Sequence, residues 1–298
     1  MENSRANRKS AKWTVLAVAL LLCFALLVGY GDTIRSRLQK EPEGDCVKVH
    51  FLDVGQGACT LIQSGKTGIL IDAGEREYAD RVISYLRHSG VRKLLLVVAS
   101  HPHTDHIGAL PEVLQAFPAE TLLLPRLTEE NTPDSYAYER LLKTVQEKEI
   151  RLVAAKPGAE YTLEHAALQV LAPLEQSANL NDMSVVCRVT AFNTTLLLPA
   201  DAEVAAQETL LQAGADLRCD VLQVPHHGSS GALNPAFLDA ASPQAAVISC
   251  GANNDYGHPH SEVLETLKYR RCNVYRTDLQ SNVVVRCYED GYRIDTDS

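Results

Sequence analysis

The sequence predicts a mixed α/β protein in which two mixed β-sheets carry helices on their outer faces. Two observations predict this class: many short apolar runs of strand length follow one another along the chain, and amphipathic helical stretches are inserted singly between them. The composition agrees, because 46% of the 298 residues are hydrophobic and 22% are charged, which excludes wholesale disorder. No internal repeat or interior linker is evident, so residues 46–298 are expected to form one domain.

The individual elements follow from local patterns. Apolar runs of strand length are Val47–Val54, Cys59–Gln63, Gly68–Asp72, Leu94–Ser100, Thr121–Leu124, Leu168–Ala172, Val185–Ala191, Thr195–Pro199, Val221–Val224, Ala246–Cys250, Val274–Arg276 and Val283–Tyr288. Stretches with helical spacing of apolar residues are Tyr78–His88, Ala109–Phe117, Ser135–Lys148, Ala202–Gln212 and Ser261–Arg270. Ser261 and Glu262 after Pro259 form a helix start signal, and Glu289-Asp290-Gly291 is a hairpin turn signal.

The N-terminal segment predicts the compartment. Residues 13–31 contain no charge, and as a helix they would span about 28 Å, close to the thickness of the hydrocarbon core of a membrane. Four basic residues within the segment 1–12 predict a cytoplasmic N-terminus, with the catalytic domain extracytoplasmic. Residues 32–45 are expected to be a tether. A cleaved signal peptide, which would give a secreted protein, and a buried soluble helix remain alternatives.

The charge balance restricts the mode of nucleic-acid binding. The formal net charge is −9, and the acidic excess lies outside the basic first twelve residues. Tight sequence-independent binding to DNA relies on many Lys and Arg contacts to phosphate, so the acidic balance argues against a broad basic surface for DNA. A nucleic acid that is held locally through metal ions is still compatible with this balance.

The eight cysteines leave two interpretations. No two of them are spaced as C-x-x-C, so a zinc ribbon is not predicted. Most lie in apolar strand-like runs, where a buried free thiol is the simplest interpretation. Alternatively, a hairpin about Leu279-Gln280 would place Cys272 opposite Cys287, and an extracytoplasmic location would permit a disulfide between them.

The strongest chemical signal is the segment Ser100-His101-Pro102-His103-Thr104-Asp105-His106, which follows a buried strand. Three imidazoles and a carboxylate lie within six residues, and bringing them together without a cation would be costly in repulsion and desolvation. Imidazole and carboxylate together suit zinc, manganese or iron. We expect His101 and His103 to face one ion, and Asp105 and His106 to face a second.

Three further strand ends offer candidate site residues. Asp201 is expected to bridge two metal ions, although capping the helix that follows it is the alternative role. His226 and His227 lie together after another strand; one should bind the second ion and the other should contact substrate, unless both are solvated turn residues. His258 is expected to contact a phosphate or a leaving group, or else to be a simple turn residue.

Taken together, these motifs resemble the metallo-β-lactamase superfamily, and within it the hydrolase domain of ComEC-type DNA-uptake competence proteins. The resemblance covers about residues 47–290. The matching segments, in family order, are Phe51-Leu52-Asp53-Val54-Gly55-Gln56-Gly57, Ile71-Asp72-Ala73-Gly74, Ser100–Gly108, Asn181-Asp182-Met183-Ser184, Asp201, Val224–Ser229 and Tyr256-Gly257-His258-Pro259.

The resemblance implies an αβ/βα sandwich with a dinuclear site between the edges of the two sheets. The implied ligands are His101 and His103 for the first ion, Asp105, His106 and either His226 or His227 for the second, and Asp201 as the bridge. Asp72 would orient a ligand histidine from outside the ligand set, and Asp53 and Gln56 would line the floor near the site.

Two departures from the family pattern stand out. Many members place a third histidine on the first metal, but the corresponding stretch here, Asn181-Asp182-Met183-Ser184, contains none. Asp182 or a water molecule would then fill that position. ComEC-type proteins also carry a multi-span channel region, and a chain with one span is not expected to form that channel.

The expected function is that of a membrane-anchored, extracytoplasmic, metal-dependent hydrolase, in particular a phosphodiesterase or nuclease that uses a metal-bound hydroxide. Two Zn or Mn ions would act with Asp105 orienting the hydroxide, while His258 or the spare histidine, such as His227, either stabilises the developing charge or protonates the leaving oxygen. Ser229 and Ser230 would bind the phosphate. The expected partners are a phosphodiester substrate such as DNA and the membrane, without a nucleotide cofactor. The alternatives are hydrolysis of another ester, such as a phosphocholine ester, a lactone or a β-lactam, and a non-catalytic metal-binding or DNA-docking module.

Overall fold

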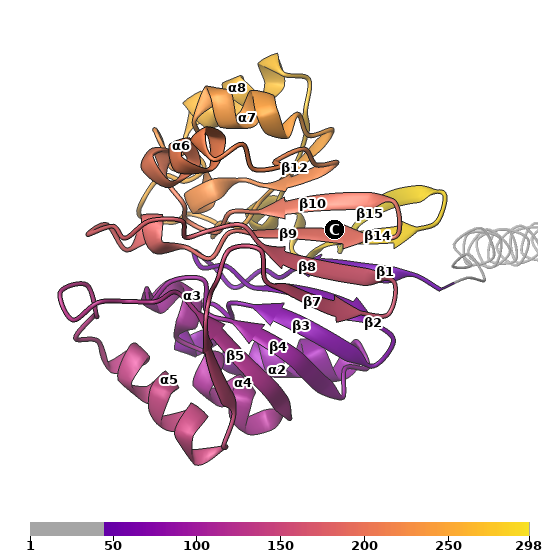
Figure 1. Cartoon of the computed structure of the whole chain (residues 1–298). Helices are drawn as coiled ribbons and strands as arrows, with labels where there is room; N and C mark the ends of the chain where they lie inside the picture. Colours follow the sequence, from indigo (N-terminus) through magenta and orange to yellow (C-terminus); the bar gives the residue numbers. More distant parts are fainter. Residues whose placement is uncertain (1–44, 298) are drawn as a thin grey trace, which may run out of the picture. The chain divides into compact units, whose positions relative to one another are not determined.

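The computed structural model describes residues 45–297, which form two β-sheets packed face to face (Figure 1). The first sheet has the strand order β15-β14-β1-β2-β3-β4-β5-β6, and the second has the order β13-β12-β11-β10-β9-β8-β7. The strands of the first sheet are β1 (Val47–Phe51), β2 (Thr60–Ser64), β3 (Thr67–Ile71), β4 (Lys93–Val98), β5 (Ala119–Leu124), β6 (Arg151–Ala154), β14 (Val283–Tyr288) and β15 (Gly291–Thr296). Those of the second are β7 (Glu160–Leu163), β8 (Ala166–Val170), β9 (Cys187–Ala191), β10 (Thr194–Leu198), β11 (Val221–Gln223), β12 (Ala245–Ile248) and β13 (Asn273–Arg276).

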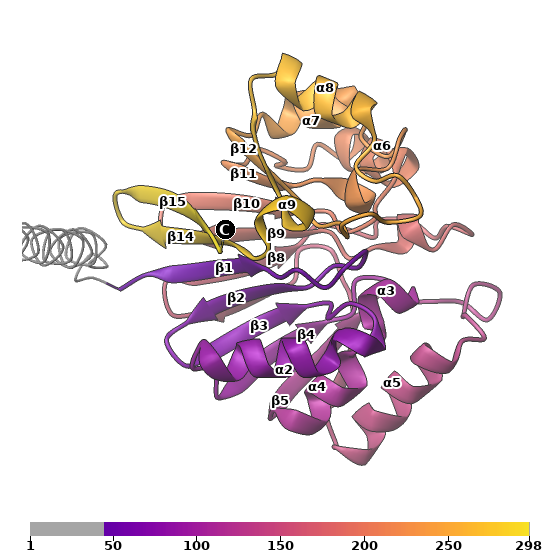
Figure 2. The same cartoon turned by 180° about the vertical axis from the view of Figure 1, so that it is seen from behind.

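Helices cover the outer face of each sheet, which completes an αβ/βα sandwich (Figure 2). On the first sheet lie α2 (Ala79–His88), α4 (Leu110–Ala116) and α5 (Tyr136–Glu147), and on the second lie α6 (Val204–Gln212), α7 (Pro235–Ala241) and α8 (Ser261–Tyr269). The short helices α3 (Thr104–Ile107) and α9 (Thr277–Gln280) belong to the connections, as do the 3₁₀ turns η1 (Arg76–Tyr78), η2 (Asn181–Met183) and η3 (Pro225–Gly228). The predicted mixed α/β class is therefore confirmed.

The strands are buried on both faces, which explains their near-continuous apolar sequence. In β10, Leu196 and Leu198 face the core between the sheets, whereas Leu197 faces the helices on the outside. Successive side chains of a strand point to opposite faces, so a strand covered on both sides needs apolar residues at every position. Each fully buried leucine contributes about 2 kcal/mol of hydrophobic stabilisation. This packing holds the strand ends, from which the site is built, in fixed positions.

Each predicted strand corresponds to a strand of the structure, with ends that differ by one to three residues in most cases. The strands β6, β7 and β15 were not predicted. All three lie at the edges of the sheets, and their exposed side chains interrupt the apolar pattern on which the prediction depends. The helix α8 begins at Ser261, as the start signal predicts, and β14 and β15 pair across the predicted turn.

The predicted hairpin about Leu279-Gln280 is wrong, and so is the disulfide that depended on it. The segment folds as α9, which leads from β13 in the second sheet to β14 in the first. Cys272 and Cys287 are buried free thiols, and burial raises their pKa values to about 11 and about 12. The simpler interpretation of the cysteines, as buried thiols, holds for this pair.

The predicted cytoplasmic segment and membrane anchor, and all but the last residue of the tether, lie outside the described residues. Among the helices of residues 45–297, none combines the length and the apolar character that a membrane span requires.

Candidate metal centre

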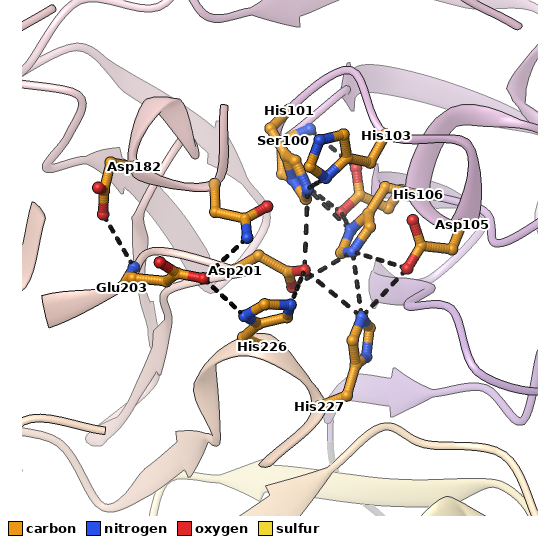
Figure 3. A network of polar contacts seen from close by, with 12 residues as sticks. Ser100, His101, His103, Asp105, His106, Asp182, Asp201, Glu203, His226 and His227 are labelled. Carbon is orange, nitrogen blue, oxygen red and sulfur yellow. Dashed lines mark hydrogen bonds and ion pairs between the residues drawn. The ribbon is translucent and has the colours of Figure 1, made fainter. Parts of the chain in front are cut away.

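Polar side chains from both sheets converge at one edge of the sandwich (Figure 3). β3 and β4 run parallel in the first sheet, and β10, β11 and β12 run parallel in the second, so the carboxyl ends of each set lie at a common edge. Short loops at these ends carry the predicted site residues: Asp72 after β3, the segment 100–106 after β4, Asp201 after β10, and His226 and His227 after β11.

The tightest group consists of Asp105, His106, Asp201 and His227, whose donor atoms all lie within 4.8 Å of one another. Nε2 of His106 is 3.2 Å from Oδ1 of Asp201 and 3.3 Å from Nε2 of His227. Nε2 of His227 is 3.4 Å from Oδ2 of Asp105. In a tetrahedral zinc site with bonds of about 2.1 Å, neighbouring donor atoms lie about 3.4 Å apart. Nε2 of His106 and Oδ2 of Asp105 lie slightly farther apart, at 3.9 Å, so these side chains are close to the geometry that holds one divalent cation.

A second, less complete group lies on the other side of Asp201. Nε2 of His101 is 3.0 Å from Nδ1 of His103 and 3.8 Å from Oδ2 of Asp201. Asp201 thus contacts both groups, because its Oδ1 faces His106 and its Oδ2 lies near His101 as well as near His227. A carboxylate in this position is suited to bridge two ions, as the sequence suggested. The second group offers only two imidazoles, in line with the missing third histidine.

Hydrogen bonds outside the two groups orient their imidazoles. Asp72, 1% exposed, places Oδ2 2.7 Å from Nδ1 of His106, and the hydroxyl of Ser100 donates to the same oxygen at 2.6 Å. Because that hydroxyl proton is used, Oγ of Ser100 accepts from Nδ1 of His101 at 3.1 Å. Nδ1 of His227 donates to the carbonyl oxygen of Ser249 at 2.8 Å. In all three histidines the Nε2 lone pair is left facing the site, as a metal ligand requires.

The carboxylates of the tight group stabilise positive charge on the histidines beside them. Burial alone would raise the pKa of Asp201, but the charges and hydrogen bonds of His106 and His227 hold it well below its usual range. Burial favours the neutral form of His227, yet Asp201 and Asp105 raise its pKa to about 9. Protons on the imidazoles and a divalent cation are therefore alternative ways of balancing these carboxylates.

This balance predicts how the stability of the metal-free protein depends on pH. The folded-state pKa of His227 is about 9, above its ordinary value of 6.5, so its contribution is complete below pH 6.5 and is lost as pH rises through 9. The loss is on the order of 3 kcal/mol. Thermal melting with a chelator should show a transition temperature that falls between pH 6.5 and 9.5. With saturating Zn²⁺ the fall should disappear, and equal slopes in the two series would contradict the assignment.

His258 lies beside the tight group, with a defined tautomer. The backbone N–H of Gly251 donates to Oε1 of Gln56 at 3.3 Å, which turns Nε2 of Gln56 toward Nδ1 of His258 at 2.9 Å. Because the amide nitrogen donates, Nδ1 of His258 accepts and its proton resides on Nε2. Burial and the neighbouring histidines lower the pKa of His258 to about 4. Of the two predicted roles, a neutral hydrogen-bond donor to developing charge fits better than an acid that protonates the leaving oxygen.

Other predicted residues are engaged elsewhere. The two carboxylate oxygens of Asp53 accept from the N–H of Gly55 and from Arg81, and its predicted place on the floor near the site stays a prediction. The hydroxyl of Ser230 donates to Glu262 in α8, and its predicted contact with phosphate stays a prediction. The role of Ser229 stays a prediction.

Asp182 stabilises the start of a helix on the second sheet. Its Oδ1 accepts from the backbone N–H groups of Glu203 and Ala206, so it caps α6, the role that the sequence offered as an alternative for Asp201. This bonding argues against Asp182 as the replacement for the missing ligand.

Glu203 itself was not predicted as a site residue. It directly precedes α6 and contacts His226. Its partner His226 lies more than twenty residues away in the sequence, so no local sequence pattern indicates the contact between them.

The sequence profile of the metallo-β-lactamase superfamily matches residues 52–252, which contain both donor groups. The chain belongs to the metallo-β-lactamase superfamily. Among solved structures, the fold is shared with the metallo-β-lactamase fold protein YhfI from Bacillus subtilis, with 15% identity, a TM-score of 0.54, and coverage of 80% of this chain and 99% of that one. It is shared also with Igni18, a metallo hydrolase from Ignicoccus hospitalis, with 15% identity, a TM-score of 0.51, and coverage of 80% and 98%.

Curated relatives include ComE operon protein 3 of Bacillus subtilis, 27% identical over 80% of this chain, and Recombination protein 2 of Haemophilus influenzae, 28% identical over 99% of it. Competence protein ComA of Neisseria gonorrhoeae is 28% identical over 85% of the chain. The resemblance to competence proteins of the ComEC type is therefore confirmed. The matched region spans about a third of the length of these relatives, at 33%, 34% and 34%.

Proposed function

We propose that this protein is a dinuclear metal-dependent phosphodiesterase that acts on nucleic acid. The observation that carries the proposal is the position of Asp201, which is 3% exposed and contacts a histidine of each donor group through a different carboxylate oxygen. A buried carboxylate shared by two sets of imidazoles is the arrangement that two-metal hydrolases use to hold a pair of cations.

The proposed roles of the side chains follow from their contacts. His101 and His103 would hold one Zn or Mn ion, Asp105, His106 and His227 the other, and Asp201 both. When bound, the two ions supply Lewis acidity and lower the pKa of water toward neutrality. Asp105, whose side chain is 30% exposed at the edge of the group, accepts a hydrogen bond from the attacking water and so orients it. His258 donates its Nε2–H to the charge that develops on the phosphate.

Two features support a nucleic-acid phosphodiester as the substrate. The chain carries a net charge of −9, so an anionic substrate is best held by cations at the site rather than by a basic surface. The curated relatives carry names that refer to competence and recombination. The fold alone does not set the substrate, since it is shared with CmlA, a diiron β-hydroxylase of Streptomyces venezuelae, at 13% identity and a TM-score of 0.53.

We further propose that residues 13–31 anchor the protein in the membrane, with residues 1–12 in the cytoplasm and the hydrolase domain outside. This topology rests on the uncharged length of the segment and the basic residues before it. Protease protection of the full-length chain in sealed cells and in inverted vesicles tests it. Digestion of the domain only in inverted vesicles would contradict the proposed orientation.

A substrate panel tests the activity. The full-length chain, loaded with Mn²⁺ or Zn²⁺, is assayed on single-stranded DNA, bis-p-nitrophenyl phosphate, a phosphocholine ester and a cephalosporin, with a chelated sample as the control. We expect metal-dependent turnover of DNA and of the small diester. Turnover of the phosphocholine ester alone would assign a different ester as substrate. No turnover of any substrate by a protein that binds two ions would indicate a non-catalytic module.

A further inference from the structure

We propose that His226 completes the first donor group in place of the missing histidine, and that Glu203 holds its imidazole in position. The inference rests on the proposed dinuclear function and extends it to two side chains. It answers the question that the sequence left open, namely which of His226 and His227 belongs to which ion, and it assigns a role to a carboxylate outside the recognised motifs.

The turn after β11 aims two adjacent histidines at one carboxylate. His226 and His227 have φ values of 49° and 55°, in the left-handed region that residues other than glycine rarely adopt. Their Nε2 atoms lie 3.7 Å and 3.5 Å from the same atom, Oδ2 of Asp201. In a strand, adjacent side chains would point to opposite faces. Each left-handed residue costs about 1–2 kcal/mol, so this turn is a strained feature of the kind found at functional sites.

The two histidines share the contact to Asp201 but differ in their other neighbours. His227 contacts Asp105 and His106, and it belongs to the tight group. His226 is not a member of that group. Its Nε2 lies 3.7 Å from Oδ2 of Asp201, an oxygen that is also 3.5 Å from Nε2 of His227 and 3.8 Å from Nε2 of His101, so Oδ2 is where the two groups meet. A third imidazole on the side of His101 would give the first ion three nitrogen donors and one oxygen donor, a set that suits zinc or manganese.

Glu203 provides the outer partner that a metal-binding histidine ordinarily has. Its Oε1 lies 3.0 Å from Nδ1 of His226 (Figure 3). The contact is an ion-pair contact rather than a hydrogen bond, because the buried Nδ1 forms no hydrogen bond within residues 45–297. A carboxylate at this distance favours the tautomer with the proton on Nδ1, which leaves the Nε2 lone pair free to bind metal.

The segment that lacks the family histidine is the segment that fixes Glu203. Nδ2 of Asn181 donates to Oε1 at 2.9 Å, and Nδ2 of Asn179 donates to Oε2 at 2.8 Å. Asp182 accepts from the backbone N–H of Glu203 at 3.1 Å. The stretch from 179 to 182 therefore contributes to the first site indirectly, by holding the carboxylate that faces His226.

Matched substitutions of the two histidines test the assignment. Asn tolerates left-handed backbone, so His226→Asn and His227→Asn each remove an imidazole while preserving the turn. The full-length wild type should bind two Zn²⁺ ions per chain by calorimetry and elemental analysis. Each variant should retain one, and anomalous diffraction of zinc-loaded crystals should place the ion of His226→Asn among Asp105, His106 and His227. Glu203→Gln should weaken the same ion as His226→Asn by about 10-fold.

His88→Ala, in an exposed histidine of α2, controls for loss of adventitious zinc binding and should match the wild type. A His226→Asn protein that still binds two ions with wild-type affinities would overturn the inference. A Glu203→Gln protein that binds both ions with wild-type affinities would overturn the role of Glu203 alone. A wild type that binds fewer than two ions would instead overturn the dinuclear function on which the inference rests. Cooperative melting of each variant verifies that it folds.

Discussion

Replacing Asp201 with Asn is expected to lower kcat/KM for a phosphodiester by at least about 10³-fold, equivalent to about 4 kcal/mol of transition-state stabilisation. The reason is that one carboxylate contacts both donor groups, with Oδ1 3.2 Å from Nε2 of His106 and Oδ2 3.8 Å from Nε2 of His101. An amide removes the negative charge and presents an N–H₂ group to imidazoles that must offer lone pairs. The loss should appear in the zinc content of the purified protein as well as in the rate.

The matched control is Asp239→Asn, which changes an exposed carboxylate of α7 that contacts Arg270. It should leave rate and metal content unchanged, because an exposed ion pair outside the donor groups contributes little to stability. An Asp201→Asn protein that turns over the diester normally and carries two ions would defeat the assignment of the bridge. Retention of two ions with loss of rate would instead restrict Asp201 to a role in the chemical step.

The positions of the site residues could be predicted because they follow buried strands. An apolar run that ends in His or Asp places that side chain at the edge of a sheet, and parallel strands bring several such ends together. This logic located His101, Asp201 and His227 from the sequence. It could not show which of His226 and His227 belongs to which donor group, because the directions of their side chains depend on a left-handed turn that the local sequence does not specify.

The remaining errors have a common cause, which is long-range contact. Glu203 and Ser249 contact the site histidines, but neither follows a recognisable motif, and the Ser249 contact uses a backbone oxygen that any residue would supply. The misplaced hairpin arose because Cys272 and Cys287 flank a segment that resembles a turn. Only the assembled sheets show that this segment crosses from one sheet to the other.

The second large effect is expected at Asp72, which touches no candidate metal position directly. The N–H of Ser100 donates to Oδ1 of Asp72 at 2.8 Å, so in Asp72→Asn the amide oxygen should remain there. The amide nitrogen then takes the place of Oδ2, 2.7 Å from Nδ1 of His106. Since an amide nitrogen donates, the imidazole must accept at Nδ1 and carry its proton on Nε2, the atom that faces Asp201.

Zinc affinity of the tight group should therefore fall by about 100-fold in Asp72→Asn, at the upper end of the effect of substituting an outer partner of a ligand histidine. The fold should persist, because Asn adopts the left-handed φ of 57° that Asp72 has. Nitrogen NMR shifts of His106 report the tautomer independently of activity. Ser100→Ala, which removes the hydrogen bonds of the hydroxyl to Asp72 and to His101 but keeps the carboxylate, should reduce the affinity of the tight group by less than about 10-fold. Wild-type affinity in Asp72→Asn would mean that the tautomer of His106 is set by the carboxylates inside the site rather than by Asp72.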